Sequence, residues 1–240
     1  MKNLLIGATA IIALATVSAS VQASPVQVRD AVGGEFASGY PGGPLLTGTG
    51  SQLIGSTTNG GDSPLYVGTF DLEADYGSGF TPLITYCIEP NQNFLFGYNP
   101  PDSVGIQYQT DPLLNGHGFT AAEADKLQIL WYYEWADSQT SATKAAAFQA
   151  LVWEWTQDNS FDLLTGNMRL QPADAYTGQV LAIALGWYGN ITSGAWTNST
   201  NLLAITHPDS QDYLAVAVPA PSVAMMMLGG LGLFGRRRRA

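Results

Sequence analysis

The chain has 240 residues, with nine Lys and Arg, nineteen Asp and Glu, and a formal net charge of −10. Nucleic acid is not an expected partner, because phosphate binding requires clustered basic side chains and the folded part of this chain offers none. The single cysteine excludes an intramolecular disulfide. Because there are only two histidines besides that cysteine, we expect no zinc site, and no cofactor is indicated.

Residues 1–23 have the three parts of a secretory signal peptide. Lys2 supplies a positive charge, Leu4 to Val17 form an apolar core too short for a stable membrane span, and Val21-Gln22-Ala23 offers small residues for cleavage. We therefore predict cleavage by signal peptidase after Ala23, with Ala19 as the alternative, and export of the rest of the chain through the inner membrane.

The next elements are predicted from turn residues and from alternation. Residues 24–61 are rich in Gly, Ser and Thr, which is typical of loops with a few short strands. Leu65 to Leu72 and Phe80 to Ile88 are runs of β-favouring residues, and the second carries Cys87. We expect both runs to form core strands.

Three helices and two closing strands are predicted after these runs. The helices are expected from the capping box Thr120-Ala121-Ala122-Glu123 to about Trp135, from about Thr143 to Trp155, and from Pro172 in a first turn to about Leu185. The second is apolar on nearly every face, so we expect it to be buried. The strands are expected at Leu202 to Thr206 and Tyr213 to Val218. Residues 62–218 are thus predicted to form a single α+β domain, a β-sheet or barrel-like core with an inserted helical cluster.

Residues 219–240 have the order of a sorting tail. Pro219 and Pro221 hold the backbone extended, and an apolar run from Val223 to Gly235 precedes the basic end, which is Arg236, Arg237, Arg238 and Arg239. This order resembles the PEP-CTERM signal of bacterial exosortase substrates, although Ala220 stands where that family usually has Glu. The resemblance implies membrane insertion, processing by an exosortase, and a final place at the cell surface or outer membrane, or secretion. An ordinary C-terminal anchor is the alternative.

Removal of the predicted signal peptide and sorting tail would leave four basic residues against nineteen acidic ones, a net charge of −15. Such acidity favours solubility outside the cell and is independent of the fold.

A glutamine in the second predicted helix requires a partner. At helical spacing Gln149 shares a face with Ala145, Val152 and Trp153, so its amide points into an apolar layer, where an unsatisfied polar group costs about 1 to 3 kcal/mol. A backbone carbonyl or a buried water would satisfy it. The lone thiol of Cys87 is the alternative partner.

The two residues lie in patterns that resemble those of bacterial thioester domains, which occur in surface adhesins and in some PEP-CTERM proteins. The residues that carry the resemblance are Tyr86-Cys87-Ile88-Glu89 and Gln149-x-x-x-Trp153, with Leu151 and Val152 where the family has Ala and Ile. Gln211 to Val216 also resembles the closing strand of the PEP-CTERM members, with Tyr213 for their second Gln. The resemblance spans residues 65–218.

This resemblance implies a crosslink between Cys87 and Gln149. The thiol would attack the side-chain carbonyl, ammonia would leave, and an amine on a surface target or in an exopolysaccharide matrix could later open the thioester. The protein would then be a single-use covalent binder and not an enzyme. Tyr86 and Trp153 could shield the bond from water, or could be ordinary core aromatics.

Three further interpretations remain open. Cys87 could stay free and buried in a structural or noncovalent carbohydrate- or matrix-associated surface protein. It could serve a cysteine hydrolase or transpeptidase together with His117 or His207, although the Gly and Pro neighbours of these histidines are typical of surface turns. Glu89 and Glu154 could assist proton transfer, but we expect each to be a solvated surface acid.

Overall fold

The computed structural model describes residues 24–31, 53–56, 62–65, 67–90, 92, 105–114, 117–158, 160–171 and 175–217. The predicted signal peptide and sorting tail lie outside the described residues. The strands are β1 Pro25–Asp30, β2 Leu53–Ser56, β3 Asp62–Leu65, β4 Phe70–Asp75, β5 Thr81–Thr85, β6 Ile106–Pro112, β7 Met168–Leu170, β8 Leu202–His207 and β9 Ser210–Val216. The helices are α1 Ala121–Ser138, α2 Ala142–Gln157 and α3 Ala175–Thr192.

The main sheet is antiparallel and has six strands in the order β5-β4-β1-β6-β8-β9. Its two outer strands approach each other, because the residues that follow β5 pair with β9. The Ile88 amide donates to the Asp212 carbonyl at 2.8 Å, and the Leu214 amide donates to the Tyr86 carbonyl at 3.1 Å. The sheet therefore curls into a half-barrel, with a seam at residues 86–88.

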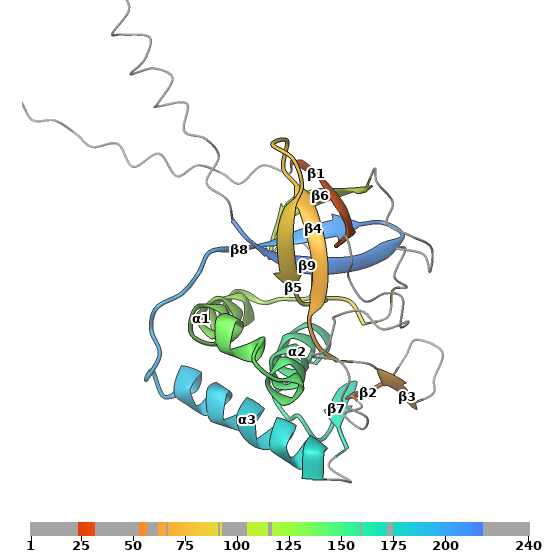
Figure 1. The fold of residues 1–240 in the computed structure, drawn as a ribbon. Helices are drawn as coiled ribbons and strands as arrows, with labels where there is room; N and C mark the ends of the chain where they lie inside the picture. Colours follow the sequence, from red (N-terminus) through yellow and green to blue (C-terminus); the bar gives the residue numbers. More distant parts are fainter. Residues whose placement is uncertain are drawn as a thin grey trace, which may run out of the picture.

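The three helices lie together at one end of this half-barrel (Figure 1). α2 occupies the middle of the helical layer, and the small sheet β3-β2-β7 lies beside it (Figure 1). Every residue of α2 from Ala145 to Trp155 is buried. An all-round apolar helix is stable only when other elements surround it, which explains its central place.

The fold class is the one predicted from the sequence, a single α+β domain with a barrel-like sheet and helices inserted between β6 and β8. The Thr120–Glu123 capping box is confirmed, since each residue's side chain accepts a hydrogen bond from the other's amide. α1 and α2 run slightly beyond their predicted ends. α3 continues to Thr192, well past Leu185, and Pro172 lies outside the described residues.

The strand predictions need larger corrections. The run expected at Leu65 to Leu72 contains only the end of β3 and the start of β4, because the chain turns between them at Gly68, which has φ of 152°. β6 and β7 were not predicted, and β9 begins at Ser210 instead of Tyr213. β1 belongs to the segment expected to precede the domain, yet it is an interior strand between β4 and β6.

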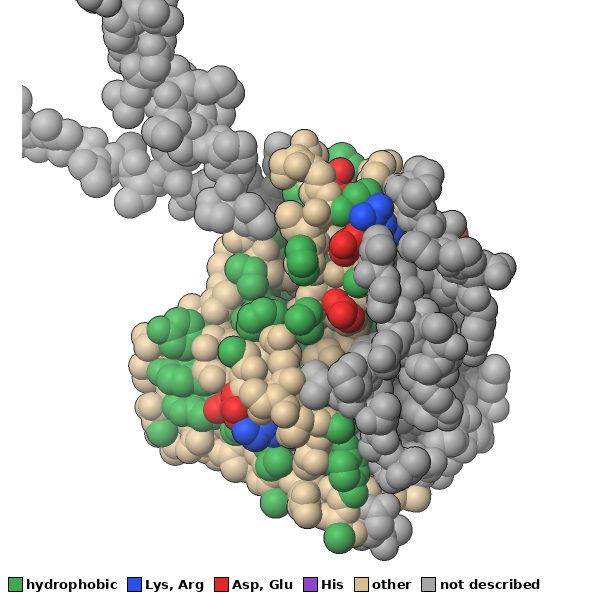
Figure 2. All heavy atoms as spheres, viewed as in Figure 1, with side chains coloured by type: hydrophobic (Ala, Val, Ile, Leu, Met, Phe, Trp, Pro, Cys, Tyr) green, Lys and Arg blue, Asp and Glu red, His purple; other side chains and the backbone are tan. Residues whose placement is uncertain are grey.

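The described surface visible in Figure 2 has apolar side chains over the helical layer and only scattered Lys and Arg. Tyr132 on α1 and Leu185 on α3 are among the exposed large apolar residues. Of the basic residues, Arg29 pairs with Glu73 at 2.6 Å and Lys144 with Asp137 at 2.7 Å. Within the described ranges, no helix combines the length and the apolar character that crossing a membrane requires.

Candidate functional site: the Cys87–Gln149 junction

Cys87 lies on the seam of the half-barrel, opposite Tyr213 of β9. The hydrogen bonds to β9 come from its neighbours Tyr86 and Ile88, so Cys87 occupies the non-hydrogen-bonded position of this short antiparallel pair. Its own N–H and C=O point away from β9. Because the residue is completely buried, these two backbone groups require partners from another element.

Gln149 of α2 supplies both partners. Its Oε1 accepts the Cys87 amide at 3.1 Å, and its Nε2 donates to the Cys87 carbonyl at 2.8 Å. Gln149 is 0 % exposed, as is Cys87. The two residues predicted to meet are therefore brought together, and the amide is satisfied by the backbone of Cys87. Of the partners considered from the sequence, the backbone carbonyl is the one observed.

This pairing fixes the Gln149 amide against the backbone of Cys87. Attack on the Gln149 carbonyl carbon would place negative charge on Oε1, which already accepts the Cys87 N–H, and such a donor stabilises an oxyanion. The thiol itself opposes the reaction. Burial raises the pKa of the Cys87 thiol far above its usual range, and Sγ donates to the Glu89 carbonyl at 3.2 Å. The Cys87 N–H would stabilise the oxyanion formed on Gln149, whereas burial disfavours the thiolate that would attack it.

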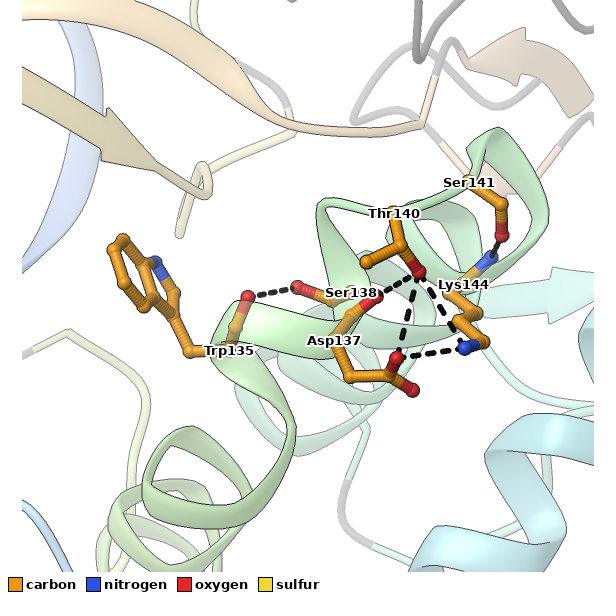
Figure 3. A network of polar contacts seen from close by, with 6 residues as sticks. All are labelled: Trp135, Asp137, Ser138, Thr140, Ser141 and Lys144. Atoms are coloured by element: carbon orange, nitrogen blue, oxygen red, sulfur yellow. Dashed lines mark hydrogen bonds and ion pairs between the residues drawn. The ribbon is translucent and has the colours of Figure 1, made fainter.

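Tyr86 anchors the seam to the helical layer. Its ring is fully buried and stacks on Phe148 at 4.2 Å between centroids, and its hydroxyl donates to Ser138 Oγ at 2.6 Å. Ser138 in turn donates to the Trp135 carbonyl at 2.7 Å at the end of α1 (Figure 3). The Trp135 indole donates to the Ile84 carbonyl of β5 at 3.2 Å. The end of α1 thus fixes the residues on both sides of Thr85.

The junction between α1 and α2 orients Gln149 in turn. Ser141 is the N-cap of α2 and accepts the Lys144 amide at 3.3 Å. The Lys144 ammonium donates to Asp137 and to Thr140 across the turn (Figure 3). These polar contacts set the direction in which α2 begins, and the residue predicted to react lies two turns along it.

Trp153 follows Gln149 by four residues on the same helix face. It is 3 % exposed, and its position beside the Cys87–Gln149 pair fits either of the roles considered from the sequence, a shield or a core aromatic. Thr156, one further turn along, donates to the Ile88 carbonyl at 3.3 Å. α2 therefore follows the seam along more than one turn.

The expectation that His117 lies in a surface turn is wrong for its side chain, which is only 9 % exposed. The ring lies between two carboxylates, with Nδ1 at 3.6 Å from Asp212 and Nε2 at 3.4 Å from Asp111. Contact with Asp212, the largest effect, raises the pKa of His117 against the opposing effect of burial. The flanking glycines indicate the loop correctly, but they cannot indicate which way the ring turns.

Among the described residues, no hydrogen bond or ion pair joins Cys87 to either histidine. His117 pairs with carboxylates, and His207 Nδ1 accepts the Asp209 amide at 3.0 Å. The hydrogen bond between nucleophile and base that the hydrolase interpretation needs is therefore not formed within the described residues.

The expectation of solvated acids also needs correction. Glu154 is 2 % exposed, with Oε1 accepting the Asp162 amide at 2.5 Å and Oε2 without a hydrogen-bond partner among the described residues. Burial, as the largest effect, raises the pKa of Glu154 to about 7. Glu89 is partly buried, its Oε2 is buried without a partner, and burial together with the Asp212 charge raises its pKa. Neither residue is an ordinary surface acid.

Across the part of the chain that the structure describes, no group of three or more His, Cys, Asp or Glu side chains is arranged to hold a metal ion. Comparison of the chain with protein-family models, with curated proteins and with solved structures finds no match.

Proposed function

We propose that this chain is an exported bacterial protein of the cell surface or extracellular matrix, and that it attaches covalently to amine-bearing targets through a Cys87–Gln149 thioester. The observation that carries the proposal is the junction itself. Two residues separated by 62 positions meet in the core, with the Gln149 amide oriented by two hydrogen bonds to the backbone of Cys87. Signal peptidase and an exosortase would process the two ends of the chain.

The proposed reaction is an exchange of acyl partners on the Gln149 carbonyl carbon. In the first step the Cys87 sulfur bonds to this carbon and ammonia leaves with the thiol proton. In the second step an amine of the target forms an amide with the same carbon, and Cys87 is released as a thiol. Because the bond is consumed once, the protein acts as a reactive binder and not as an enzyme.

Burial supports the first step in one way and opposes it in another. Because the fold holds the two reacting groups together, no bimolecular encounter is needed, and this can lower the activation barrier by several kcal/mol. The neutral state of the buried thiol opposes the same step, since the thiolate is the nucleophile. We therefore expect slow, self-limited formation of the bond after folding, and little exchange with solvent.

The bond would also stabilise the fold. It would close a loop of about sixty residues between the seam and α2, which in the chain-entropy treatment of crosslinks is worth about 4 kcal/mol. Cys87→Ala should abolish amine incorporation and lower the free energy of unfolding by about this amount, measured by urea denaturation.

The direct test is the intact mass of freshly purified protein, with and without methylamine. We expect a mass one ammonia short of the sequence mass, converted by methylamine to an adduct on Gln149 with Cys87 newly open to alkylation. Cys87→Ser is the matched control, and it should keep the full mass and form no adduct. Full mass and a free thiol in the natural sequence would refute the thioester.

A structural surface domain with a free Cys87 is the second candidate, and a specific observation favours it. Both polar atoms of the Gln149 amide already have a hydrogen-bond partner without the thiol, so the junction connects the seam to α2 as a noncovalent latch. In that case the exposed side chains would mediate noncovalent contacts with a carbohydrate or matrix, and Cys87→Ala would cost only about 1 kcal/mol for the lost packing.

A further inference from the structure

The indole of Trp153 has a buried N–H whose bonding is not explained by the fold. Its side chain is 3 % exposed, and within the described residues Nε1 has no hydrogen-bond partner. A buried donor without a partner costs free energy, and such groups are uncommon in native proteins. Trp155, two residues along the same helix, also has a buried N–H with no partner in the part of the chain that the structure describes, and it serves as an internal comparison.

The position of Trp153 is fixed by two hydrogen-bonded neighbours on its helix face. Gln149, one turn before it, binds the backbone of Cys87, and Thr156, one turn after it, donates to the carbonyl of Ile88. Residues at spacings of three and four share a face, so Trp153 lies between them against the same two residues of the seam. Trp155 points elsewhere on the helix.

The influences on the Cys87 thiol agree with this placement of the Trp153 indole. Burial raises the pKa of the Cys87 thiol, the carboxylates of Glu89 and Asp212 raise it further, and the Trp153 side chain is the largest opposing influence. The spacing along α2 thus places the buried indole N–H, which has no formed hydrogen bond among the described residues, beside the residue that carries the sulfur. A neutral thiol is a weak acceptor, so this donor stays largely unused until the sulfur is charged.

We propose that the Trp153 N–H stabilises the negative charge that develops on the Cys87 sulfur when the thioester forms and when an amine opens it. This inference rests on the proposed function. It makes Trp153 a catalytic residue of that reaction, in contact with the reacting sulfur, and not only part of the apolar shield.

The charge on sulfur arises in both directions of the reaction. On opening, the amine nitrogen bonds to the Gln149 carbonyl carbon, the bond between that carbon and Sγ breaks, and its electron pair goes to sulfur. The proton lost by the attacking nitrogen ends on Sγ, so the products are an amide and a thiol. On formation, Sγ gives up its proton, which leaves with ammonia. Donors that tighten only as charge develops lower the barrier without stabilising the resting state.

The Cys87 N–H and the Trp153 N–H therefore have separate roles. The Cys87 N–H donates to Gln149 Oε1 and would stabilise negative charge on that oxygen in the tetrahedral intermediate. The second faces the sulfur and stabilises charge on the leaving group. Both donors come from elements that the fold holds rigidly, the seam and the buried helix.

The test compares Trp153→Phe with Trp155→Phe in the full-length protein, because each change removes one buried indole N–H from the same helix. We expect Trp153→Phe to slow methylamine incorporation, followed by intact mass, by about tenfold or more relative to Trp155→Phe. Equal rates in the two variants would overturn the inference. Benzothienylalanine at either position, which keeps the indole shape and replaces the N–H by sulfur, gives the same comparison without a change of size.

A second readout separates chemistry from packing. The free energy of unfolding of the two variants, measured by urea denaturation, is compared with their methylamine rates. We expect similar losses of stability in both variants and a slower reaction in Trp153→Phe alone. Rates that fall in proportion to the losses of stability would indicate a packing role and would overturn the inference.

The outcome for the unsubstituted protein distinguishes the two proposals. If it has the full mass and a free thiol, the proposed function fails and this inference fails with it. If it carries the thioester and the two tryptophan variants react alike, only the inference about Trp153 fails.

Discussion

The two buried polar side chains of α2, Gln149 in its middle and Glu154 near its C-terminal end, have different surroundings in the fold. Gln149 is a neutral amide whose oxygen and nitrogen are both paired with the backbone of Cys87. Glu154 is an acid with one oxygen paired to the Asp162 amide and the other without a partner. A paired amide can be buried at any pH, whereas a half-paired carboxyl is buried comfortably only when it is protonated.

The comparison shows that burial alone does not identify a reactive site. Gln149 joins elements that are far apart in the chain, and its loss would leave the buried N–H and C=O of Cys87 without these partners. Glu154 holds a local loop, in which the Asp158 carboxylate also accepts the amides of Asn167 and Met168. Gln149 therefore connects distant elements of the fold, whereas Glu154 stabilises one local loop.

The largest expected effect comes from Gln149→Ala. The change leaves the N–H and C=O of Cys87 buried without partners and adds a cavity, so we expect a loss of at least about 3 kcal/mol in the free energy of unfolding. Urea denaturation measures it. Gln157→Ala at the end of the same helix is the control and should change stability by less than about 0.5 kcal/mol. Similar small losses in both variants would contradict the latch.

Glu154→Gln tests the other side of the comparison. The pKa of Glu154 is raised from 4.5 to about 7, first by burial, so the folded state keeps a proton that the unfolded state has lost between these values. Stability should therefore fall as the pH rises from about 4.5 to about 7 and level off above that range.

The variant should remove this fall and be more stable than the natural sequence by about 1 to 2 kcal/mol at pH 8, because its amide carries no charge. Urea unfolding at several pH values measures the effect. Asp125→Asn, which removes a charge at an exposed site on α1, is the control for net charge. If the free energy of unfolding of Glu154→Gln changes with pH in parallel with that of the natural sequence, the Glu154 carboxyl is hydrated in solution.

The smallest effect is expected at the exposed ion pair of Lys144 and Asp137. Their side chains are 35 % and 46 % exposed, so water screens the attraction and ordering the side chains offsets part of it. Lys144→Ala should cost about 0.5 kcal/mol, and less in high salt. A double-mutant cycle with Asp137→Ala measures the coupling, and a coupling above about 1.5 kcal/mol would mean that this turn matters as much as the buried junction.

The sequence predicted the helices better than the strands, for a physical reason. The capping box at Thr120 and the apolar run of α2 are local signals, and both are confirmed. β1 and β6 lie beside each other although nearly eighty residues separate them, and neither short polar run shows which strand it will join. β7 has only three residues and depends on pairing with β2.

The candidate site shows the same division. The meeting of Cys87 with Gln149 could be predicted from their patterns, and the buried amide required a partner of some kind. The two hydrogen bonds could not be predicted, because they follow from the non-hydrogen-bonded position of Cys87 opposite Tyr213. The burial of His117 between Asp111 and Asp212 likewise depends on strands that are not adjacent in the chain.

The seam also determines when the molecule can be completed. β9 is the last strand in the described part of the chain, and it supplies both one outer strand of the sheet and the backbone partners of residues 86 and 88. Contacts between such distant segments form late and slowly. A nascent chain that ends before Ser210 contains Cys87 and Gln149 but cannot close the half-barrel around them, so the junction is assembled only after β9 has emerged.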